Sequence, residues 1–452
     1  MNPPASQIDA DMVKSAVPTP GISPRVAMAA GIGHFLEWFD FAVYGFLAVI
    51  IGRNFFPSED PTTSLLASLA VFGVAFFFRP LGGFVIGAFG DRVGRRAALS
   101  LAIVLMGACT ILIGVLPNYA AIGVAAPILL VILRCAQGFS AGGEYAGAAT
   151  FLVEYAPKGR RGLWSSVVSA GAGLGVMGGG AVTLLLTALL SDAQMDSWGW
   201  RLPFLIAGPL SVIGLYVRLK LEDTPIFREL QQAHSIDQTP LRNAGRRSLS
   251  AILLTFTCTA VTGLGFYYLA TFVNTFLSVE IGMSKTVALA LAITGLAIYS
   301  LMCPIAGIIG DRIGRRPTML IGATGIAFAG IPAFALMATG NWAFALLGIS
   351  IFAAFESLVN VMLGVIMVEL FPARNRVSGS SIGFNVAQAV VGGPGPFVAT
   401  AIAASVAITV APAFYVVAIA IVCAIILWKF LPETQGVSLS EAPAEENIET
   451  IR

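Results

Sequence analysis

Two copies of one basic loop limit the architectures open to this chain. GDRVGRR at 90–96 returns as GDRIGRR at 310–316, and each copy lies between two long apolar runs. A second pair of loops, EYAPKGRRG at 154–162 and ELFPARNRV at 369–377, repeats in the same order at nearly the same offset. Chance recurrence of short Arg/Gly-rich turns would not keep this order and flanking pattern, so we infer two structurally equivalent halves.

The apolar runs place these halves in a membrane. The 452-residue chain is 57% hydrophobic and only 11% charged, whereas roughly 25% of residues are charged in an ordinary soluble domain. In membrane proteins, repeated halves often enclose a midplane site that they expose alternately to each side. The net charge of +2 gives no indication of a nucleic-acid partner.

The runs are long enough to predict twelve membrane-spanning helices, because a crossing needs about 20 mostly apolar residues. The expected fold is therefore an all-α polytopic membrane protein of two pseudo-symmetric six-helix bundles. The expected spans are 27–50, 64–88, 97–116, 125–153, 163–190, 202–219, 249–277, 286–309, 318–338, 342–368, 378–403 and 409–431. The expected domains are an N-terminal tail (1–25), a first bundle (26–219), a linker (220–248), a second bundle (249–431) and a C-terminal tail (432–452).

The basic residues predict the orientation. With both termini in the cytoplasm, most of the 26 Lys and Arg residues lie on the cytoplasmic side, as the positive-inside rule requires. The linker and both tails are then cytoplasmic, and Trp198 and Trp200 lie at the external interface, where indole rings are enriched. We expect a monomer.

The motifs of common enzyme classes are absent from the sequence. It has no G-x-x-x-x-G-K-[ST] phosphate loop and no H-E-x-x-H zinc motif, and its five cysteines all fall inside apolar runs. We expect no enzymatic activity, no cofactor and no bound metal.

Six ionisable residues lie well inside the expected spans, where a charge costs roughly 2.5–3.5 kcal/mol and usually marks a functional pathway. They are Glu37, Asp40, Arg79, Arg134, Glu144 and Glu356. His34, Glu37 and Asp40 are spaced to share one broad helix face. With Arg79 they are our candidates for proton coupling, since a carboxylate can take up or release a proton as a neighbouring arginine is engaged or freed. The alternative is a permanent buried ion pair of Arg79 with one of them, and His34 could equally be a core histidine.

Arg134 and Gln137 lie one helical turn apart, and a guanidinium at that depth could dock a carboxylate by two parallel hydrogen bonds. The alternative for Arg134 is a tether to Glu144 or to backbone carbonyls. Glu144 and Glu356 could each simply pair with an intramembrane arginine, and any single polar residue could be an inter-helix hydrogen bond. The substrate-binding candidates are Arg79, Arg134, Gln137, Tyr145, Tyr267, Asn274, Glu356, Asn360, Asn385 and Gln388.

The duplicated loops determine topology and could also form a gate. We expect them to be solvated, with Asp91 and Asp311 pairing with arginines at the inner ends of the second and eighth spans. The gating candidates are Asp91, Arg95, Arg96, Asp311, Arg315 and Arg316. Small residues in GAGLGVMGGG (171–180) favour close helix packing, and the Gly/Pro sequence at 392–396 predicts a bend in the eleventh span.

At this point the motifs resemble a known family. GDRxGRR in both halves, RxxQG in the fourth span and PxxxRG after it are similar to the major facilitator superfamily. HFLEWFDFAVYGF (34–46), FRPLGG (78–83), QGFSAGGEYAGA (137–148) and WGWRLPF (198–204) resemble, more narrowly, its metabolite:proton symporters, such as the proline/betaine, citrate, α-ketoglutarate and shikimate transporters. The resemblance implies a bacterial inner-membrane protein that takes up a small organic acid or zwitterion with a proton. Glu37, Asp40 and Arg79 are carried over as coupling residues.

The first half is most similar to the proline/betaine members, and the second half departs from them. Phe272, Asn274 and Phe276 stand where those relatives tend to carry an aromatic, a proline and an aromatic, and the tail after 432 has no heptad pattern. Two other functions stay open. One is a proton-coupled exporter, although Val176 replaces the proline typical of antiporters; the other is a non-transporting membrane sensor.

Overall fold

The computed structural model describes residues 24–220, 223–232 and 248–439, and nearly all of them are helical. The first half contains α2 (Pro24–Phe46), α3 (Ala48–Phe55), α4 (Pro61–Val93), α5 (Arg95–Val115), α6 (Tyr119–Ile122), α7 (Ala125–Tyr155), α8 (Arg161–Leu189), α9 (Asp192–Gln194), the π-helical turn η1 (Met195–Gly199), α10 (Arg201–Leu219) and, after it, α11 (Pro225–Gln232). The second half contains α13 (Leu249–Tyr267), η2 (Tyr268–Phe272), α14 (Val273–Thr275), η3 (Phe276–Glu280), α15 (Lys285–Ile313), α16 (Arg315–Ala338), α17 (Trp342–Glu369), α18 (Arg376–Ala387), η4 (Gln388–Gly392), α19 (Gly395–Ser405) and α20 (Ala411–Phe430).

The expected all-α membrane fold is confirmed. In the described part of the chain, 11 helices are long and apolar enough to cross a membrane, and a bent pair brings the count to 12. That pair corrects the first expected span. It is not one straight helix over 27–50, because α2 and α3 meet at Leu47 with a bend of 66°. The bend lets α3 bury Phe55, whose ring packs edge-on against Trp200 at a centroid distance of 5.6 Å.

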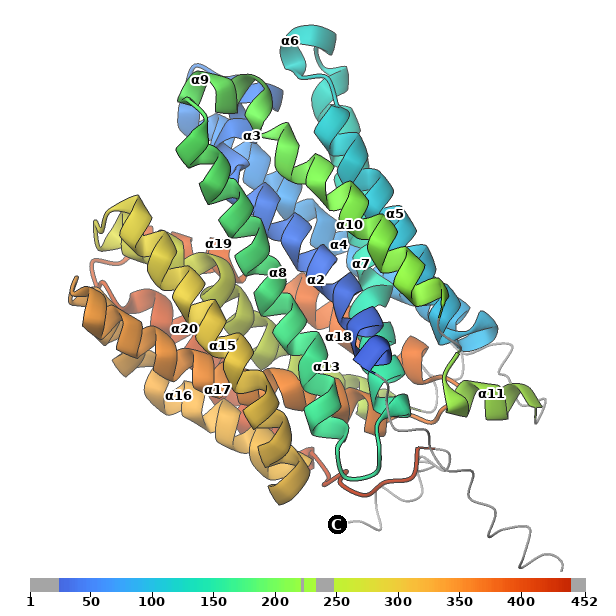
Figure 1. The fold of residues 1–452 in the computed structure, drawn as a ribbon. Coiled ribbons are helices and arrows are strands. Elements are labelled where there is room, and N and C mark those ends of the chain that lie inside the picture. The colour runs from blue at the N-terminus through green and yellow to red at the C-terminus, as the bar shows by residue number, and fades with distance from the viewer. Residues whose placement is uncertain (1–23, 221–222, 233–247, 440–452) are drawn as a thin grey trace, which may run out of the picture.

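The two halves meet along two equivalent helix pairs. α8 of the first half packs along α15 of the second, and α4 of the first packs along α18 of the second. Within the halves, α2 packs along α8 and α4 along α7, while α16 packs along α17. In Figure 1 the first half (blue to green) and the second half (yellow to red) converge at the end that carries α11. We call this end, with the loops at 90–96, 154–162, 310–316 and 369–377, the linker end.

The second glycine of each duplicated loop turns the chain between two spans. Gly94 separates α4 from α5 with φ 132°, and Gly314 separates α15 from α16 with φ 105°. These φ values lie where residues with a Cβ are strained. A Cβ at Gly94 would also overlap the carboxylate of Asp223, and one at Gly314 would overlap that of Glu433. The repeat in the sequence is therefore a repeat of backbone geometry.

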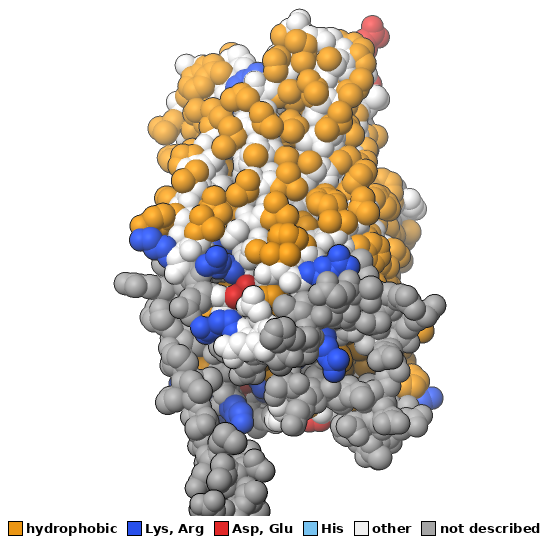
Figure 2. Space-filling view, turned by 90° about the vertical axis from the view of Figure 1, so that its right-hand side faces the viewer, with side chains coloured by type: hydrophobic (Ala, Val, Ile, Leu, Met, Phe, Trp, Pro, Cys, Tyr) orange, Lys and Arg blue, Asp and Glu red, His pale blue; other side chains and the backbone are white. Residues whose placement is uncertain are grey.

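The surface has the polarity of a membrane protein. On the face shown in Figure 2, apolar side chains cover the part of the molecule away from the linker end, and Lys and Arg side chains gather where this apolar surface ends. Large apolar residues are strongly exposed on the outer helices, among them Phe328 (83%), Phe397 (71%) and Trp428 (69%). In water this exposure would be costly, whereas in lipid it costs nothing.

The Gly/Pro sequence of the eleventh span does interrupt its helix. α18 passes into the π-helical turn η4, and α19 starts at Gly395. The predicted bend is nevertheless modest, since residues 376–403 still qualify as a single span. π-helical turns often occur at functional sites, and η4 begins with the binding candidate Gln388. Most of the two expected tails and of the linker lies outside the described residues.

Candidate functional site

Two carboxylates one helical turn apart on α2 each contact a different arginine. Glu37 Oε1 lies 2.8 Å from Nη2 of Arg79 on α4, and Asp40 Oδ2 lies 3.0 Å from Nη1 of Arg134 on α7. All four side chains are at most 1% exposed. The predicted alternative of a buried Arg79 pair is therefore what the structure contains, with Glu37 as the partner. A buried pair is costly to break by removing one partner, because a desolvated charge is left behind.

Asp40 is the centre of a buried polar network. Its carboxylate accepts hydrogen bonds from Thr110 Oγ1 (3.0 Å), Gln137 Nε2 (3.0 Å) and Arg134 Nη1 (3.0 Å). Gln137 also donates to Thr110 (2.8 Å) and accepts from Arg134 (2.7 Å). Arg134 is therefore tethered to Asp40, and the predicted tether to Glu144 is wrong. Thr110 was not predicted, because a threonine in an apolar run gives no distinguishing signal.

The contacts of His34 indicate which of its two ring nitrogens carries the proton. Trp38 donates its indole N–H to His34 Nε2 at 3.0 Å, so Nε2 is the unprotonated acceptor. The remaining proton is then on Nδ1, which faces Glu37 Oε2 at 3.2 Å. The assigned state is a neutral imidazole that donates to Glu37. A chain of contacts therefore runs from Trp38 through His34 and Glu37 to Arg79.

Both arginines retain unused donors. Nε and Nη1 of Arg79, and Nε and Nη2 of Arg134, are buried without a hydrogen-bond partner. The Arg79 guanidinium lies 5.8–5.9 Å from the ring centroids of Phe41, Phe76 and Phe384. Aromatic faces stabilise a cation without consuming its N–H groups. Each arginine therefore keeps hydrogen-bonding capacity for an anion.

Glu144 has a different partner from the one the sequence suggested. Its Oε1 lies 2.5 Å from Nη2 of Arg218, which is near the C-terminal end of α10. Arg218 is only 2% exposed, and it also donates to the Leu99 carbonyl at 2.6 Å. Because Arg218 lies at the end of an apolar run, just before Lys220, its burial could not be predicted from hydropathy. The pair ties α7 to α10 within the first half.

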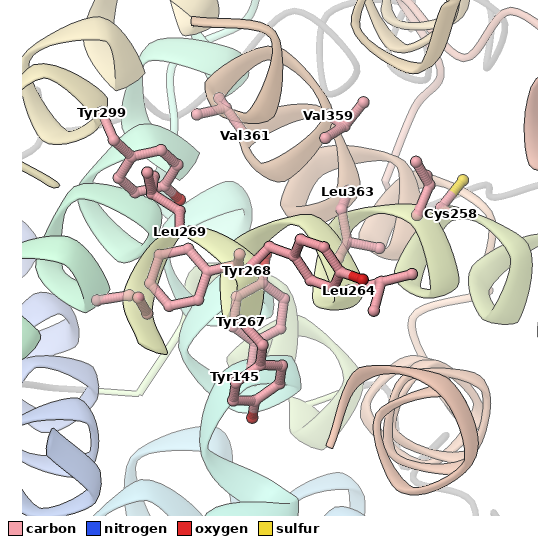
Figure 3. Packing of buried hydrophobic residues seen from close by; sticks show 14 of the residues in the cluster. Tyr145, Cys258, Leu264, Tyr267, Tyr268, Leu269, Tyr299, Val359, Val361 and Leu363 are labelled. Carbon is pink, nitrogen blue, oxygen red and sulfur yellow. The ribbon is translucent and has the colours of Figure 1, made fainter. Parts of the chain in front are cut away.

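The second half contributes polar side chains to the same central region. Asn385 donates to the Gly142 carbonyl of α7 at 2.6 Å, and Tyr145 of α7 donates to the Asn360 carbonyl of α17 at 3.4 Å, so both contacts join the halves. Figure 3 shows Tyr145, Tyr267 and Tyr299 coming from the separate helices α7, α13 and α15.

Several polar atoms in this region have no partner. They include the hydroxyl of Tyr267 and the amide oxygens of Asn385 and Gln388. Glu356 has no arginine partner in the described part of the chain, so the alternative of an ion pair is wrong for this residue. Asn274 lies in the short helix α14 and is only partly buried. Its binding role stays a prediction.

At the linker end, the duplicated aspartates cap helices of the opposite half. Asp91 of α4 accepts from the backbone N–H and the hydroxyl of Ser378 on α18 (2.8 and 2.7 Å). Asp311 of α15 accepts from the backbone N–H groups of Gly162 and Leu163 on α8 (2.8 and 2.9 Å). The expectation that these loops are solvated is wrong here, because the Asp91 side chain is fully buried.

Two glutamates not predicted from the sequence complete these contacts. Glu154 of α7 pairs with Arg376 of α18 (2.7 Å) and with Arg95 (3.6 Å). In the equivalent position, Glu369 of α17 pairs with Arg161 of α8 (2.8 Å) and with Arg315 (3.3 Å). The repeated E-x₆-R spacing of 154–161 and 369–376 was the available signal. Each glutamate therefore bridges the halves.

The segments after α10 and α20 cap the duplicated loops. Asp223 accepts from the backbone N–H groups of Arg95 and Arg96 (3.1 and 3.4 Å), and Glu433 accepts from those of Arg315 and Arg316 (2.9 and 3.2 Å). Burial raises the pKa of the Asp223 carboxyl, and the amides that it caps oppose this shift. The Arg316 side chain donates to the Trp428 carbonyl of its own half. Arg96 and Arg316 thus contribute backbone N–H groups, while Arg95 and Arg315 contribute side chains to the inter-half bridges.

Comparisons with known proteins match the whole architecture. The family description "Sugar (and other) transporter" matches residues 26–243, and "Major Facilitator Superfamily" matches residues 255–451. The chain is 34% identical to the glycine betaine/proline/ectoine/pipecolic acid transporter of Dickeya dadantii, over 94% of this chain and 86% of that protein. It is 35% identical to the proline/betaine transporter of Escherichia coli, over 94% and 87%.

A solved structure agrees with this fold. The structure of a proton:xylose symporter bound to 6-bromo-6-deoxy-D-glucose superimposes with a TM-score of 0.78, covering 94% of this chain and 98% of that one. Sequence identity to it is 19%, so this match concerns the fold alone.

Proposed function

Because the chain belongs to the major facilitator superfamily and is a membrane transporter rather than an enzyme, we propose that it is a proton-coupled symporter. It takes up a small carboxylate-bearing or zwitterionic metabolite by alternating access. The names of its relatives, which include proline and betaine, favour a zwitterion. No cofactor is required, because the proton gradient supplies the free energy.

The observation that carries the coupling proposal is the network around Asp40. This carboxylate is buried and holds Arg134, Gln137 and Thr110 in one arrangement. A proton on Asp40 removes the negative charge that holds Arg134 Nη1 and makes one carboxyl oxygen a donor. Arg134 is then released toward another acceptor. Protonation thus changes the hydrogen-bonding capacity of the site, which is what symport requires.

Substrate binding engages the second ion pair. Arg79 has Nε and Nη1 free for a carboxylate while Nη2 stays with Glu37. A bound substrate carboxylate shares Arg79 with Glu37, so the Glu37 carboxylate is less strongly neutralised and accepts a proton more readily. His34, which already faces Glu37 through Nδ1, is placed to assist.

The contacts at the linker end form the gate. To open this end, the protein breaks the caps made by Asp91 and Asp311 and the bridges made by Glu154 and Glu369. We place the linker end in the cytoplasm, since the Lys and Arg band in Figure 2 matches the positive-inside bias. The protein then lies in a bacterial inner membrane with both termini inside, and we propose that it acts as a monomer because each chain carries both halves of the site.

The test is uptake into proteoliposomes under an imposed inward proton gradient. The labelled panel is proline, glycine betaine, α-ketoglutarate, citrate and shikimate, each with and without a protonophore. We expect protonophore-sensitive accumulation of at least one zwitterion. Accumulation that persists with the protonophore would exclude proton coupling. Proton-driven release of a preloaded dye, with no uptake of the panel, would instead establish an exporter.

A further inference from the structure

Glu356 on α17 is the one buried carboxylate among the described residues that has no arginine partner. The other buried carboxylates each lie within 3.6 Å of an arginine nitrogen; they are Glu37, Asp40, Asp91, Glu144, Glu154 and Glu369. Glu356 is 0% exposed, and the Asn360 side chain, about one helical turn along α17, interacts with it but carries no charge. An isolated buried carboxylate is costly unless a proton or a cation neutralises it. The protein therefore keeps a carboxylate here whose charge no described arginine neutralises.

The surroundings of this carboxylate are aromatic. It lies against the backbone of α13, because a Cβ at Gly265 would overlap a Glu356 oxygen. Tyr145 of α7 donates to the Asn360 carbonyl, about one turn further along α17, and Tyr299 of α15 packs against Phe266, the residue after Gly265, with ring centroids 5.2 Å apart. A carboxylate beside aromatic rings suits an alkylated ammonium group, which is stabilised by ring faces as well as by negative charge.

A single aromatic stack connects this position to the free donors of Arg79. The Tyr145 ring lies parallel to Phe384, with centroids 4.4 Å apart and an interplanar angle of 4°. Arg79 also lies beside Phe384, with its guanidinium carbon 5.9 Å from the ring centroid. The first half therefore offers unused donors on Arg79, and the second half offers a carboxylate without an arginine partner.

We propose that Glu356 binds the cationic group of a zwitterionic substrate while Arg79 binds its carboxylate. This inference rests on the proposed transport function and assigns its substrate class. A zwitterion satisfies both charges at once and bridges the two halves. A dianion leaves Glu356 facing a negative charge, and a monoanion leaves it unpaired; both carry the penalty of a buried uncompensated charge. Glu356 is thus the residue that selects a zwitterion over a plain carboxylate.

The test compares two ligands of the same shape on the purified protein in detergent. Glycine betaine carries a trimethylammonium group, and 3,3-dimethylbutyrate carries an uncharged tert-butyl group in its place. Equilibrium binding of each is measured by isothermal titration calorimetry. We expect the wild type to prefer glycine betaine, and Glu356→Gln to reduce that preference by about tenfold or more through weaker betaine binding.

Two further variants separate the effect of the Glu356 charge from a general disturbance of α17. Glu356→Asp retains the charge on a shorter side chain, and should bind betaine more weakly while keeping the preference for it. Ser357→Ala changes the next residue of α17, whose hydroxyl donates only to the Ala354 carbonyl of its own helix, and should bind both ligands as the wild type does.

An unchanged preference in Glu356→Gln would overturn the inference, as would a wild type that binds both ligands equally or neither. The proteoliposome assay tests the transport proposal separately. If Glu356→Gln loses the preference for glycine betaine but the wild type shows no proton-driven uptake, the binding role of Glu356 is supported and proton coupling is contradicted. If uptake of a zwitterion is proton-driven and Glu356→Gln keeps the preference for glycine betaine, transport is supported and this inference is contradicted.

Discussion

Asp91 and Asp311 occupy equivalent positions in the two halves, and each carboxylate caps the N-terminus of a helix in the opposite half. Asp91 accepts a backbone hydrogen bond of 2.8 Å from the first turn of α18, and Asp311 accepts one of 2.8 Å from the first turn of α8. A helix N-terminus attracts negative charge, so each contact gains from the helix dipole as well as from its hydrogen bonds. Both gains are lost when the halves separate at the linker end.

Neutralising either aspartate should favour opening of the linker end. A hydrogen bond to a charged group contributes about 1.5–3 kcal/mol, so Asp91→Asn should raise the population of the open state roughly 10- to 100-fold. The measurement is hydrogen exchange at the first turn of α18, which should accelerate. Asp311→Asn should act in the same way on the first turn of α8.

Asp196→Asn is the matched control. Asp196 forms an exposed ion pair with Arg53, at an N–O distance of 2.6 Å, and belongs to neither of these helices. It should leave exchange in both helices unchanged. If hydrogen exchange at the first turns of α18 and α8 is as slow in Asp91→Asn and Asp311→Asn as in the wild type, the contacts of these two aspartates do not hold the halves together.

The glycine of the duplicated loop should be needed for stability. In Gly94→Ala the new Cβ must occupy a φ of 132° and overlaps the Asp223 carboxylate, a strain of roughly 1–3 kcal/mol. Thermal unfolding in detergent should therefore occur at a lower temperature. Gly73→Ala, in the same helix α4, meets no atom within 4 Å and should not lower it. Equal effects of the two substitutions would contradict the geometric explanation.

The number of spans and the equivalent positions of Asp91 and Asp311 could be predicted because both depend on local or repeated patterns. Apolar length identifies a span, and the duplicated loop placed Asp91 and Asp311 at equivalent ends. The bend at Leu47 could not be predicted, since the packing of Phe55 on Trp200 that accompanies it is a contact between distant segments. Such a contact leaves no periodic signal.

The sequence did not predict which arginine each buried carboxylate of the site contacts. Helical spacing placed Glu37 and Asp40 on one face of α2, but it could not show which arginine each would meet. That depends on the rotation of α4 and α7, so a tether to Glu144 stayed open as one alternative for Arg134, whose partner is Asp40. The actual partner of Glu144 is Arg218, which lies at the end of the expected span 202–219 and was therefore not counted among the residues well inside a span.

Arg79 and Arg134 should affect different steps: Arg79 substrate binding, and Arg134 proton coupling. Arg79 has two unused donors and contacts the aromatic stack, whereas Arg134 is held by both Asp40 and Gln137. Lysine keeps the charge but cannot make a two-pronged contact with a carboxylate. Arg79→Lys should therefore weaken substrate binding by about tenfold or more.

Arg134→Lys should change binding less and proton-driven accumulation more, because it disturbs Asp40 first. Calorimetric binding and proteoliposome uptake, measured on both variants, separate the two effects. A larger loss of affinity in Arg134→Lys than in Arg79→Lys would reverse the assignment and make Arg134 the main carboxylate ligand.

Asp40→Asn should separate coupling from transport. The amide has nearly the shape of the carboxyl group and can still accept from Thr110 or Gln137, but it can neither release a proton nor neutralise Arg134. Substrate should therefore still exchange across the membrane, while accumulation driven by the proton gradient falls to equilibrium. The measurement is a pair of assays in one proteoliposome preparation, counterflow exchange of labelled substrate and uptake under an imposed gradient. Loss of exchange and accumulation to the same extent would show instead that Asp40 only holds Arg134 in place, and that the coupling proton binds elsewhere.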